Sequence, residues 1–308
     1  RVRQQPVEAR PSKVRVEDFA RPVTPEMGAL LEALPRILAG ETLRGAVDAV
    51  VRAARDRRLV LAMLGGHVVK TGCGPLIVQL MEERIVTAVA MNGAAAIHDY
   101  EVARFGRTSE DVEAALGAGP FGMAAETATG MNAVTRRGAR DGLGLGEALG
   151  EALDAEDIPF RGQSVLAAAH RLGLPATVHV ALGTDILHQH PSADGAAIGE
   201  TSLRDFRILA GLLEGFGGGV ALNIGSAVVL PEVFLKAFSV AANLGADLTG
   251  ITTVSFDFLR QYRPRVNVVE RPTAGGRGTG YELVGHHEIL LPLFAAGVLR
   301  TRAALEAG

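Results

Sequence analysis

The sequence predicts an α/β protein with a mostly parallel sheet that helices cover on both faces. Short apolar runs of strand length, such as 59–64, recur along the chain, and stretches with apolar residues at helical spacing lie between them. A strand that is buried on both faces is apolar throughout, whereas a half-exposed strand alternates apolar and polar residues. Continuous apolar strands that alternate with helices therefore indicate a parallel sheet between two layers of helices.

The expected elements begin with two helices. Thr24 stands before Pro25 and Glu26, which is typical of a helix start, and a second helix is expected from about Glu41 to Ala54. A glycine-rich stretch, 273–280, is expected to be a mobile loop before a last helix over 283–307. Between these ends, strands are expected at 59–64, 85–91, 176–182, 219–224 and 251–256, and helices at 74–84, 110–118, 144–155, 163–172, 202–214 and 230–244.

Residues 1–22 are expected to form a flexible N-terminal arm, and residues 23–308 a single α/β nucleotide-binding domain. The arm mixes both charge signs with two prolines and has no apolar centre, so it does not resemble a secretory signal. No linker or solenoid repeat divides the rest of the chain. The longest apolar stretch, 289–299, contains a proline and is shorter than the roughly 20 residues that a membrane helix needs, so no membrane partner is expected.

The composition excludes several classes of partner. The chain has 308 residues, of which 48% are hydrophobic and 21% charged, with a formal net charge of −3, as in an ordinary globular protein. Its only lysines are Lys13, Lys70 and Lys236, so no polybasic segment is available for nucleic acid. The single cysteine, Cys73, excludes an internal disulfide and multi-cysteine metal sites, which favours a reducing cytoplasm.

Histidines gather where a parallel sheet binds its ligands, outside the carboxyl ends of the strands. A buried histidine without a partner is costly, so this grouping indicates a function. One interpretation is a metal site formed by His188, His190 and His286. The other is a set of acid-base groups around a polar ligand, with Asp185 nearby, and the absence of a known metal-ligand spacing favours it. Seven of the eight histidines take part in the grouping: His67, His98, His179, His188, His190, His286 and His287.

Glycine turns are the second feature of the expected strand ends. Gly65, Gly66, Gly93, Gly225 and Gly285 each follow a strand or open a helix. Without a side chain, backbone N–H groups and the helix dipole can reach a phosphate or a carboxylate, so the pattern indicates a nucleotide site. The chain has no Walker A motif and no strand-linked G-x-G-x-x-G motif. Tight turns that bind no ligand are therefore an equal alternative for any one of these glycines.

In the order of its motifs the chain resembles the deoxyhypusine synthase family. LAMLGGHVVKTGCGPLIVQLMEERIVTAVAMNGAAAIHDYE (61–101) is similar to the family's strand, glycine- or serine-rich turn and helix before a TGAN..HD turn. Residues 174–190 resemble the strand with an LTDG turn, and residues 220–247 the glycine-rich turn and NGAD segment. VSFDFLRQYRP resembles the EFDGS...ARP stretch, and residues 281–294 the last strand and helix. The resemblance covers most of 59–299.

The resemblance implies a single Rossmann-like domain, bound NAD, and a homotetramer with active sites between paired subunits. It also implies two contacts to a small-molecule substrate. His190 falls near a substrate carboxylate of the family, and Glu232 falls near the family's substrate-contacting histidine. The residues that would meet the cofactor are Gly65, Gly66, His67, Thr71, Asn92, Gly93, His98, Asp185, Gly225, Ser226, Asp257, Gly285 and His286.

The imine-forming lysine of the family is missing from this chain. The family carries it in an SWGK segment, where this chain has NVVERP (267–272), without lysine or tryptophan. Arginine cannot replace it, because a guanidinium stays protonated and is no nucleophile. True deoxyhypusine synthesis is therefore not expected. Arg260, Arg263 and Arg265 favour an anionic substrate over a polyamine, with a solvated arginine face as the alternative.

Together these observations lead to one principal hypothesis about function and two alternatives. The principal hypothesis is an NAD-dependent enzyme that oxidises a small alcohol or amine and can then transfer, eliminate or reduce. His188 or His190 would act as general base, and Glu232 or Glu270 would orient the substrate. The alternatives are a catalytically silent protein that binds NAD or another nucleotide, and a metal-dependent hydrolase that uses the histidines. No sequence feature identifies the substrate.

Overall fold

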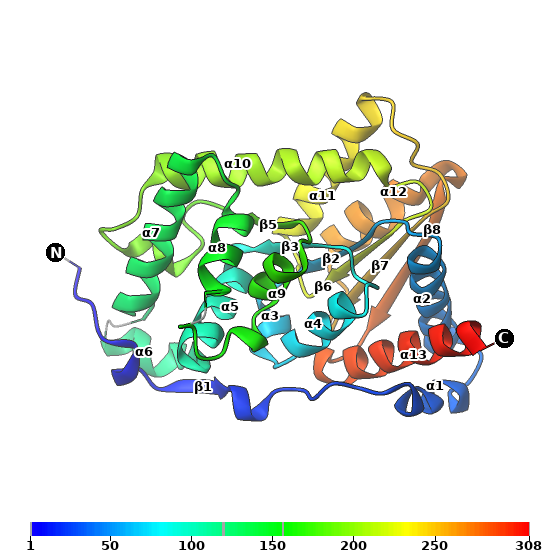
Figure 1. Cartoon of the computed structure of the whole chain (residues 1–308), viewed down its shortest axis with the longest axis horizontal. Coiled ribbons are helices and arrows are strands. Elements are labelled where there is room, and N and C mark those ends of the chain that lie inside the picture. The colour runs from blue at the N-terminus through cyan, green and yellow to red at the C-terminus, as the bar shows by residue number, and fades with distance from the viewer. Residues whose placement is uncertain (1, 119–120, 156, 308) are drawn as a thin grey trace.

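The computed structural model describes residues 2–118, 121–155 and 157–307 (Figure 1). At its centre is a six-stranded sheet with the strand order β5-β3-β2-β6-β7-β8, and every neighbouring pair of strands is parallel. The predicted α/β fold with a parallel sheet is therefore confirmed. The strands are β2 (Val60–Leu64), β3 (Ala88–Asn92), β5 (Ala176–His179), β6 (Val220–Ile224), β7 (Ile251–Asp257) and β8 (Gly278–Val284).

Helices connect the strands and lie on both faces of the sheet (Figure 1). Among the described residues the α-helices are α1 (Ala29–Ala33), α2 (Leu38–Arg55), α3 (Gly66–Lys70), α4 (Gly74–Glu82), α5 (Gly93–Phe105), α6 (Val112–Ala118), α7 (Ala125–Asp141), α8 (Leu145–Leu153), α9 (Val165–Leu172), α10 (Gly195–Leu212), α11 (Val229–Asn243), α12 (Arg271–Thr273) and α13 (His287–Ala307).

The two faces of the sheet form two separate cores. Alternate residues of β2 point to opposite faces, so Ala62 and Leu64 belong to one core while Leu61 and Met63 belong to the other. The first core includes side chains of α2, α4, α5, α8, α9 and α13, and the second includes side chains of α10 and α11. This division explains why the central strands are almost entirely apolar, with Asn223 of β6 as the polar exception.

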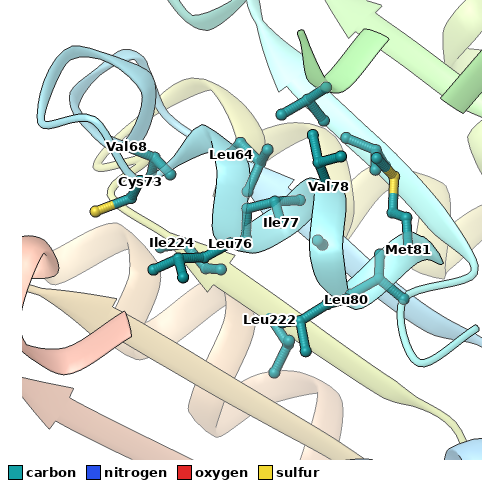
Figure 2. Packing of buried hydrophobic residues seen from close by; sticks show 14 of the residues in the cluster. Leu64, Val68, Cys73, Leu76, Ile77, Val78, Leu80, Met81, Leu222 and Ile224 are labelled. Carbon is teal, nitrogen blue, oxygen red and sulfur yellow. The ribbon is translucent and has the colours of Figure 1, made fainter. Parts of the chain in front are cut away.

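Helix α4 shows how the first core is built (Figure 2). Leu76 and Ile77 project from α4 and are each 1% exposed. They lie with Leu64 of β2 and with Leu222 and Ile224 of β6 in the same buried cluster. Because β2 and β6 are the two central strands, this packing holds α4 against the centre of the sheet.

The N-terminal segment lies along the molecule, from α6 at one end to α1 and α13 at the other (Figure 1). Its strand β1 (Ser12–Arg15) pairs antiparallel with β4 (Arg107–Glu110), and Val14 lies opposite Thr108. Val7 is buried, as is Arg10. The sequence pattern predicted a flexible arm here, whereas these contacts hold the segment against the domain.

The last part of the sheet differs from the sequence-based expectation. Strand β8 begins inside the glycine-rich stretch that was expected to be a mobile loop. A Cβ atom on Gly278 would lie 2.0 Å from the carbonyl oxygen of Ile251, and one on Gly280 would lie 2.6 Å from that of Val269. Glycine is therefore required here by the close approach of neighbouring backbones. The final helix starts at His287 because residues 281–284 complete the strand.

None of the helices in the described ranges combines the length and the apolar character needed to cross a bilayer.

Candidate functional site

The strand order places one switch point at the centre of the sheet. Counted from β2, the chain runs outward to β3 and β5 on one side and to β6, β7 and β8 on the other. The order is thus 3-2-1-4-5-6, and ligands of such sheets bind outside the carboxyl ends of the two strands at the reversal. These ends are at Gly65, after β2, and at Gly225, after β6.

Several predicted site residues come together at this switch point. The N–H of Gly65 donates to the carbonyl of Ile224 at 2.8 Å, so the ends of β2 and β6 are held side by side. The N–H of Gly225 donates to Phe256 at 2.9 Å, and the N–H of Gly285 donates to Asp257 at 2.9 Å. Predicted residues from four strand ends, Gly65, Gly225, Asp257 and Gly285, therefore form one continuous edge.

The glycines at this edge are required by the packing of the protein itself. A Cβ atom on Gly65 would lie 2.0 Å from the carbonyl oxygen of Gly225, and one on Gly66 would lie 3.0 Å from the Cβ of Ala94. Gly225 has a φ of +67°, which side chains rarely adopt, and its Cβ would lie 2.7 Å from Nε2 of His287. Glycine alone is thus no evidence for a ligand at this edge.

Aromatic rings from three turns meet beside the glycines. The ring centroid of His67 is 5.4 Å from that of Phe258 and 5.8 Å from that of His287. His286 stacks on Phe258 with an interplanar angle of 6°. His67 follows β2, Phe258 follows β7, and His286 and His287 follow β8. This group, which we call the histidine cluster, therefore gathers at the predicted edge of the sheet.

His287 is the exceptional member of the histidine cluster. It is 1% exposed, and within the described residues neither ring nitrogen has a hydrogen-bond partner. Burial lowers the pKa of His287, so the imidazole is neutral at neutral pH. Nearby on β6, Oδ1 of Asn223 is also buried without a partner, while its Nδ2 donates to the carbonyl of Ser226 at 3.1 Å. Buried polar atoms are normally paired, so these atoms have hydrogen-bonding capacity that a water molecule or a polar ligand can use.

A pocket lies between helices α3 and α5, and we call it the α3–α5 pocket. Its volume is about 200 Å³. Helix α3 begins at the switch point with Gly66 and ends in this pocket with Lys70. A helix rises about 1.5 Å per residue, so the two places are roughly 6 Å apart along α3. The charged and histidine side chains that line the pocket are Arg10, Lys70, His98, Glu101, Glu110 and Asp185.

His98 connects the pocket to a buried polar network. Its Nδ1 is 2.8 Å from Oγ1 of Thr108, which donates to Oε2 of Glu101 at 2.6 Å. Glu101 also accepts two hydrogen bonds from Arg10 and one from Thr127. Burial lowers the pKa of His98 to about 4. Sequence reasoning placed His98 in the site but missed Arg10, Glu101 and Thr108. Arg10 comes from a distant part of the chain, and Thr108 lies on β4, beyond the end of α5, so no helical spacing relates it to His98.

The two predicted catalytic histidines have structural contacts. Nδ1 of His188 accepts from the backbone N–H groups of Gly183 and Asp185 at 3.1 and 3.2 Å. His190 is 4% exposed, and both of its ring nitrogens are used, at 2.7 Å from Nε2 of Gln4 and 2.8 Å from the carbonyl of Gly122. The described contacts therefore place neither histidine in the histidine cluster, and His190 holds the N-terminal segment.

The two predicted carboxylates form ion pairs near the surface. Glu232 pairs with Lys236 and with Arg263, and it accepts from Nδ2 of Asn267 at 2.8 Å. Glu270 pairs with Arg265. The third arginine of the proposed anionic site, Arg260, pairs with Glu282 at 3.2 Å. Each of the three guanidinium groups therefore already faces a carboxylate.

The remaining predicted cofactor residues form local contacts around α3 and α5. Oγ1 of Thr71 donates to the carbonyl of His67 at 2.9 Å, and Oδ1 of Asn92 accepts from the N–H of Ala95, capping α5. Gly93 faces Asp185, since its Cβ would lie 1.9 Å from Oδ2. Oγ of Ser226 accepts from the N–H of Leu230.

A metal centre gains no support from the geometry. In the part of the chain that the structure describes, no three His, Cys, Asp or Glu side chains are placed to hold a metal ion. His190 contacts Gln4 and Gly122, whereas His286 stacks on Phe258 at the switch point. The three histidines of the metal interpretation thus have separate environments.

Comparison with known proteins identifies the fold. No protein-family model matches the chain, and no curated protein is similar to it in sequence. A ternary complex of AgrE with ornithine and NAD+ matches 88% of this chain at 14% identity with a TM-score of 0.52. A conserved protein from Methanococcus maripaludis S2, provisionally assigned to LOR/SDH, matches 86% at 12% identity with a TM-score of 0.54.

A third match bears on the resemblance seen in the sequence. A protein from Entamoeba histolytica, provisionally named a deoxyhypusine synthase, matches 84% of this chain and 87% of its own chain at 12% identity, with a TM-score of 0.50. The chain spans 35% of the AgrE chain, 69% of the M. maripaludis chain and 33% of ArgZ, a cyanobacterial arginine dihydrolase. At these identities the matches show a shared fold, which is similar to that of deoxyhypusine synthase-like proteins.

Proposed function

We propose that the protein is an NAD-dependent enzyme that binds its cofactor at the switch point and oxidises a small molecule in the adjoining α3–α5 pocket. The observation that carries this proposal is His287, a buried side chain whose ring nitrogens have no hydrogen-bond partner among the described residues, at the place where sheets of this order bind dinucleotides. The solved complex of AgrE with NAD+ supports it, because AgrE shares the fold.

The residues at the switch point fit a dinucleotide in their chemistry. The backbone N–H groups of Gly66 and Ser226 would face its phosphates, since turns beside helix starts suit anions. His287 and Oδ1 of Asn223 are buried polar atoms that would gain hydrogen-bond partners. Asp257, which is 6% exposed, accepts the N–H of Phe258 through Oδ1. His67 and His286 stand at the open side of the histidine cluster, with Phe258 between them.

Bound NAD+ would supply an acceptor for a hydride ion. The chain's own contribution is to orient the substrate and to accept a proton, and the α3–α5 pocket holds side chains for both tasks. Lys70 has no hydrogen bond or ion pair to any other described residue, whereas His98 is fixed through Thr108. The convergence of a histidine, a lysine and carboxylates in one pocket favours an enzyme over a catalytically silent nucleotide-binding protein.

We also propose the homotetramer with sites between subunits that the sequence resemblance implies. Exposed apolar side chains follow β7 and β8 next to the histidine cluster, and a partner subunit would cover them: Phe258, Leu259, Tyr262, Val284 and Ile289. Light scattering coupled to size-exclusion chromatography would give the assembly, and a monomer at all concentrations would contradict it.

The function is tested by measuring NADH formation with a defined panel of compounds. The panel contains 2-propanol, glycerol and L-lactate as alcohols and L-ornithine and putrescine as amines. NADH formation with any of these compounds supports an NAD-dependent enzyme. NAD+ binding without turnover of any compound would favour the silent nucleotide-binding protein, and the absence of NAD+ binding by the folded protein would contradict both.

A further inference from the structure

We propose that His98 is the proton acceptor of the α3–α5 pocket, that Thr108 and Glu101 are positioning residues that fix its tautomer, and that the substrate is a small alcohol. This inference rests on the proposed function for its hydride acceptor. The assignment of the tautomer rests on the structure of the chain alone.

The hydrogen-bond network assigns the proton on His98. Glu101 accepts hydrogen bonds from both Nη groups of Arg10, at 2.7 and 2.9 Å. It is therefore an ionised carboxylate, which can accept hydrogen bonds but cannot donate them. Thr108 has one hydroxyl proton, and it donates that proton to Oε2 of Glu101 at 2.6 Å. The 2.8 Å contact between Thr108 and His98 must then have the histidine as donor. Nδ1 of His98 therefore carries the proton.

The other ring nitrogen of His98 is left as a free acceptor. Nε2 has no hydrogen-bond partner among the described residues, and His98 lines the pocket. Burial lowers the pKa of His98 to about 4, which keeps the imidazole neutral and its Nε2 lone pair available at neutral pH. A proton accepted at Nε2 makes an imidazolium ion, which burial disfavours, and the negative charge of Glu101 offsets part of that cost. The arrangement resembles other histidine bases whose second nitrogen is held by a carboxylate, here with a hydroxyl between them.

The neutral acceptor of His98 and the cation of Lys70 suit a hydroxyl group as the reacting group. Each carboxylate that lines it already accepts a protein donor: Glu101 from Arg10, Glu110 from the N–H of Gly122 at 2.8 Å, and Asp185 from the N–H of His188. Lys70 is the cation in the pocket without an ion-pair partner among the described residues. The backbone donors leave the charges of Glu110 and Asp185 in place, so the alcohol is chosen by local contacts and not by net charge: Lys70 would stabilise the negative charge that develops on its oxygen.

The proton step then balances as follows. The O–H bond of the alcohol breaks, and its proton passes to Nε2 of His98. The electron pair of that bond becomes the second bond of the new carbonyl group as the neighbouring C–H hydrogen leaves as hydride for the acceptor. The imidazolium ion returns its proton to solvent, which completes the cycle.

The tautomer is tested on protein without NAD+. In protein labelled with ¹⁵N-histidine, long-range ¹H–¹⁵N correlation distinguishes the two neutral tautomers, and loss of one signal set in His98→Gln assigns His98. We expect a neutral ring with the proton on Nδ1 from about pH 8 to about pH 5. Thr108→Val removes the acceptor and should release the fixed tautomer, whereas Thr108→Ser should retain it. A proton on Nε2 in the wild type, or an unchanged signal in Thr108→Val, would overturn the assignment.

A matched control separates this effect from the loss of any buried hydroxyl. Thr135 is 5% exposed, and its Oγ1 donates to the carbonyl of Met131 in the same helix at 2.9 Å. Thr135→Val should leave the His98 signals unchanged. If Thr135→Val shifts the His98 signals as much as Thr108→Val does, the tautomer responds to a general loss of packing, and the positioning role of Thr108 is wrong.

The proton-acceptor role is tested by separating turnover from cofactor binding. In His98→Gln the rate of NADH formation from the alcohols should fall about 100-fold or more, while the Kd for NAD+ stays within about twofold. Lys70→Met should also lower the rate, and Lys70→Arg should restore part of it. Loss of NAD+ binding in His98→Gln would show a cofactor ligand instead, and turnover of the amines but not the alcohols would contradict the substrate class. Failure of the wild type to bind NAD+ would contradict the proposed function and the hydride step. The tautomer experiment would then still test the hydrogen bonds among His98, Thr108 and Glu101, because it needs no NAD+.

Discussion

Arg10 and Glu101 form a buried bidentate ion pair, with Nη1 2.7 Å from Oε1 and Nη2 2.9 Å from Oε2, and both side chains are 2% exposed. The pair joins the N-terminal segment to α5, next to His98. The position of the pocket wall therefore depends on a residue from the beginning of the chain.

Breaking this ion pair should destabilise the fold strongly. Arg10→Met leaves the Glu101 carboxylate buried without its cation, so we expect the free energy of unfolding to fall by about 3–5 kcal/mol. Urea unfolding followed by circular dichroism gives this value. Arg55→Met is the matched control, because Arg55 pairs with Asp56 at the exposed end of α2 and should leave the stability unchanged. If both substitutions lower the free energy of unfolding equally, the buried ion pair contributes no more to stability than the exposed one.

Gly225→Ala should be more harmful than an alanine at a comparable glycine. Gly225 and Gly173 have φ angles of +67° and +65°, so the backbone strain is the same at both positions. Only at Gly225 does a Cβ meet another group, 2.7 Å from Nε2 of His287, while Gly173 has open space. We expect Gly173→Ala to cost about 1 kcal/mol and Gly225→Ala at least about 1 kcal/mol more, measured by thermal or urea unfolding. A cost at Gly225 no larger than at Gly173 would contradict the described contact with His287.

His287→Leu should improve stability and impair cofactor binding. The wild-type ring is buried without partners, and an apolar side chain removes this cost of about 1–3 kcal/mol, partly offset by its different shape. The melting temperature without NAD+ should therefore rise or stay constant, while the Kd for NAD+ increases about tenfold or more. His170→Gln, on the exposed face of α9, serves as control and should change neither. A strong loss of stability in His287→Leu would mean that the ring has a structural partner.

His179 makes stability depend on pH in a defined direction. Burial lowers the pKa of His179 to about 4 from an ordinary value of 6.5, and the side chain is 3% exposed. Between these values the unfolded chain binds the proton and the folded protein does not, so stability is complete above pH 6.5 and is lost as the pH falls toward 4.

The matching measurement compares urea unfolding at about pH 7 and about pH 5. One depressed histidine pKa accounts for about 2 kcal/mol of stability lost between these conditions. His179→Gln removes this titration and should lessen the pH dependence by about that amount, although its stability at neutral pH will be lower. If the free energy of unfolding depends on pH equally in the wild type and in the variant, the pKa of His179 is not lowered in the folded protein.

The positions of five of the six sheet strands and of many helices could be predicted from sequence because both cores impose periodic patterns on the chain. Residues 60–64 are apolar throughout, and residues 220–224 are apolar except for Asn223, since helices cover both of their faces. Helix α5 was not predicted: it is rich in alanine and is buried on most sides, so it lacks an amphipathic pattern. The strand β8 was obscured by glycines that the neighbouring backbone requires at Gly278 and Gly280.

The candidate site was only partly predictable from sequence. The position of a residue after a strand is a local property, and it correctly brought Gly65, Gly225, Asp257 and Gly285 to one edge. Whether a histidine has a partner is a tertiary property. His190 is satisfied by Gln4 and Gly122, and His287 is satisfied by no described residue, yet both look alike in the sequence.

A crystal structure of the protein soaked with NAD+ tests the central claim most directly. The account predicts the cofactor at the switch point, with its phosphates at the turns of Gly66 and Gly225 and a polar atom within hydrogen-bond distance of His287. NAD+ bound elsewhere on the molecule, or a fully occupied crystal in which both His287 nitrogens remain unpaired, would contradict it.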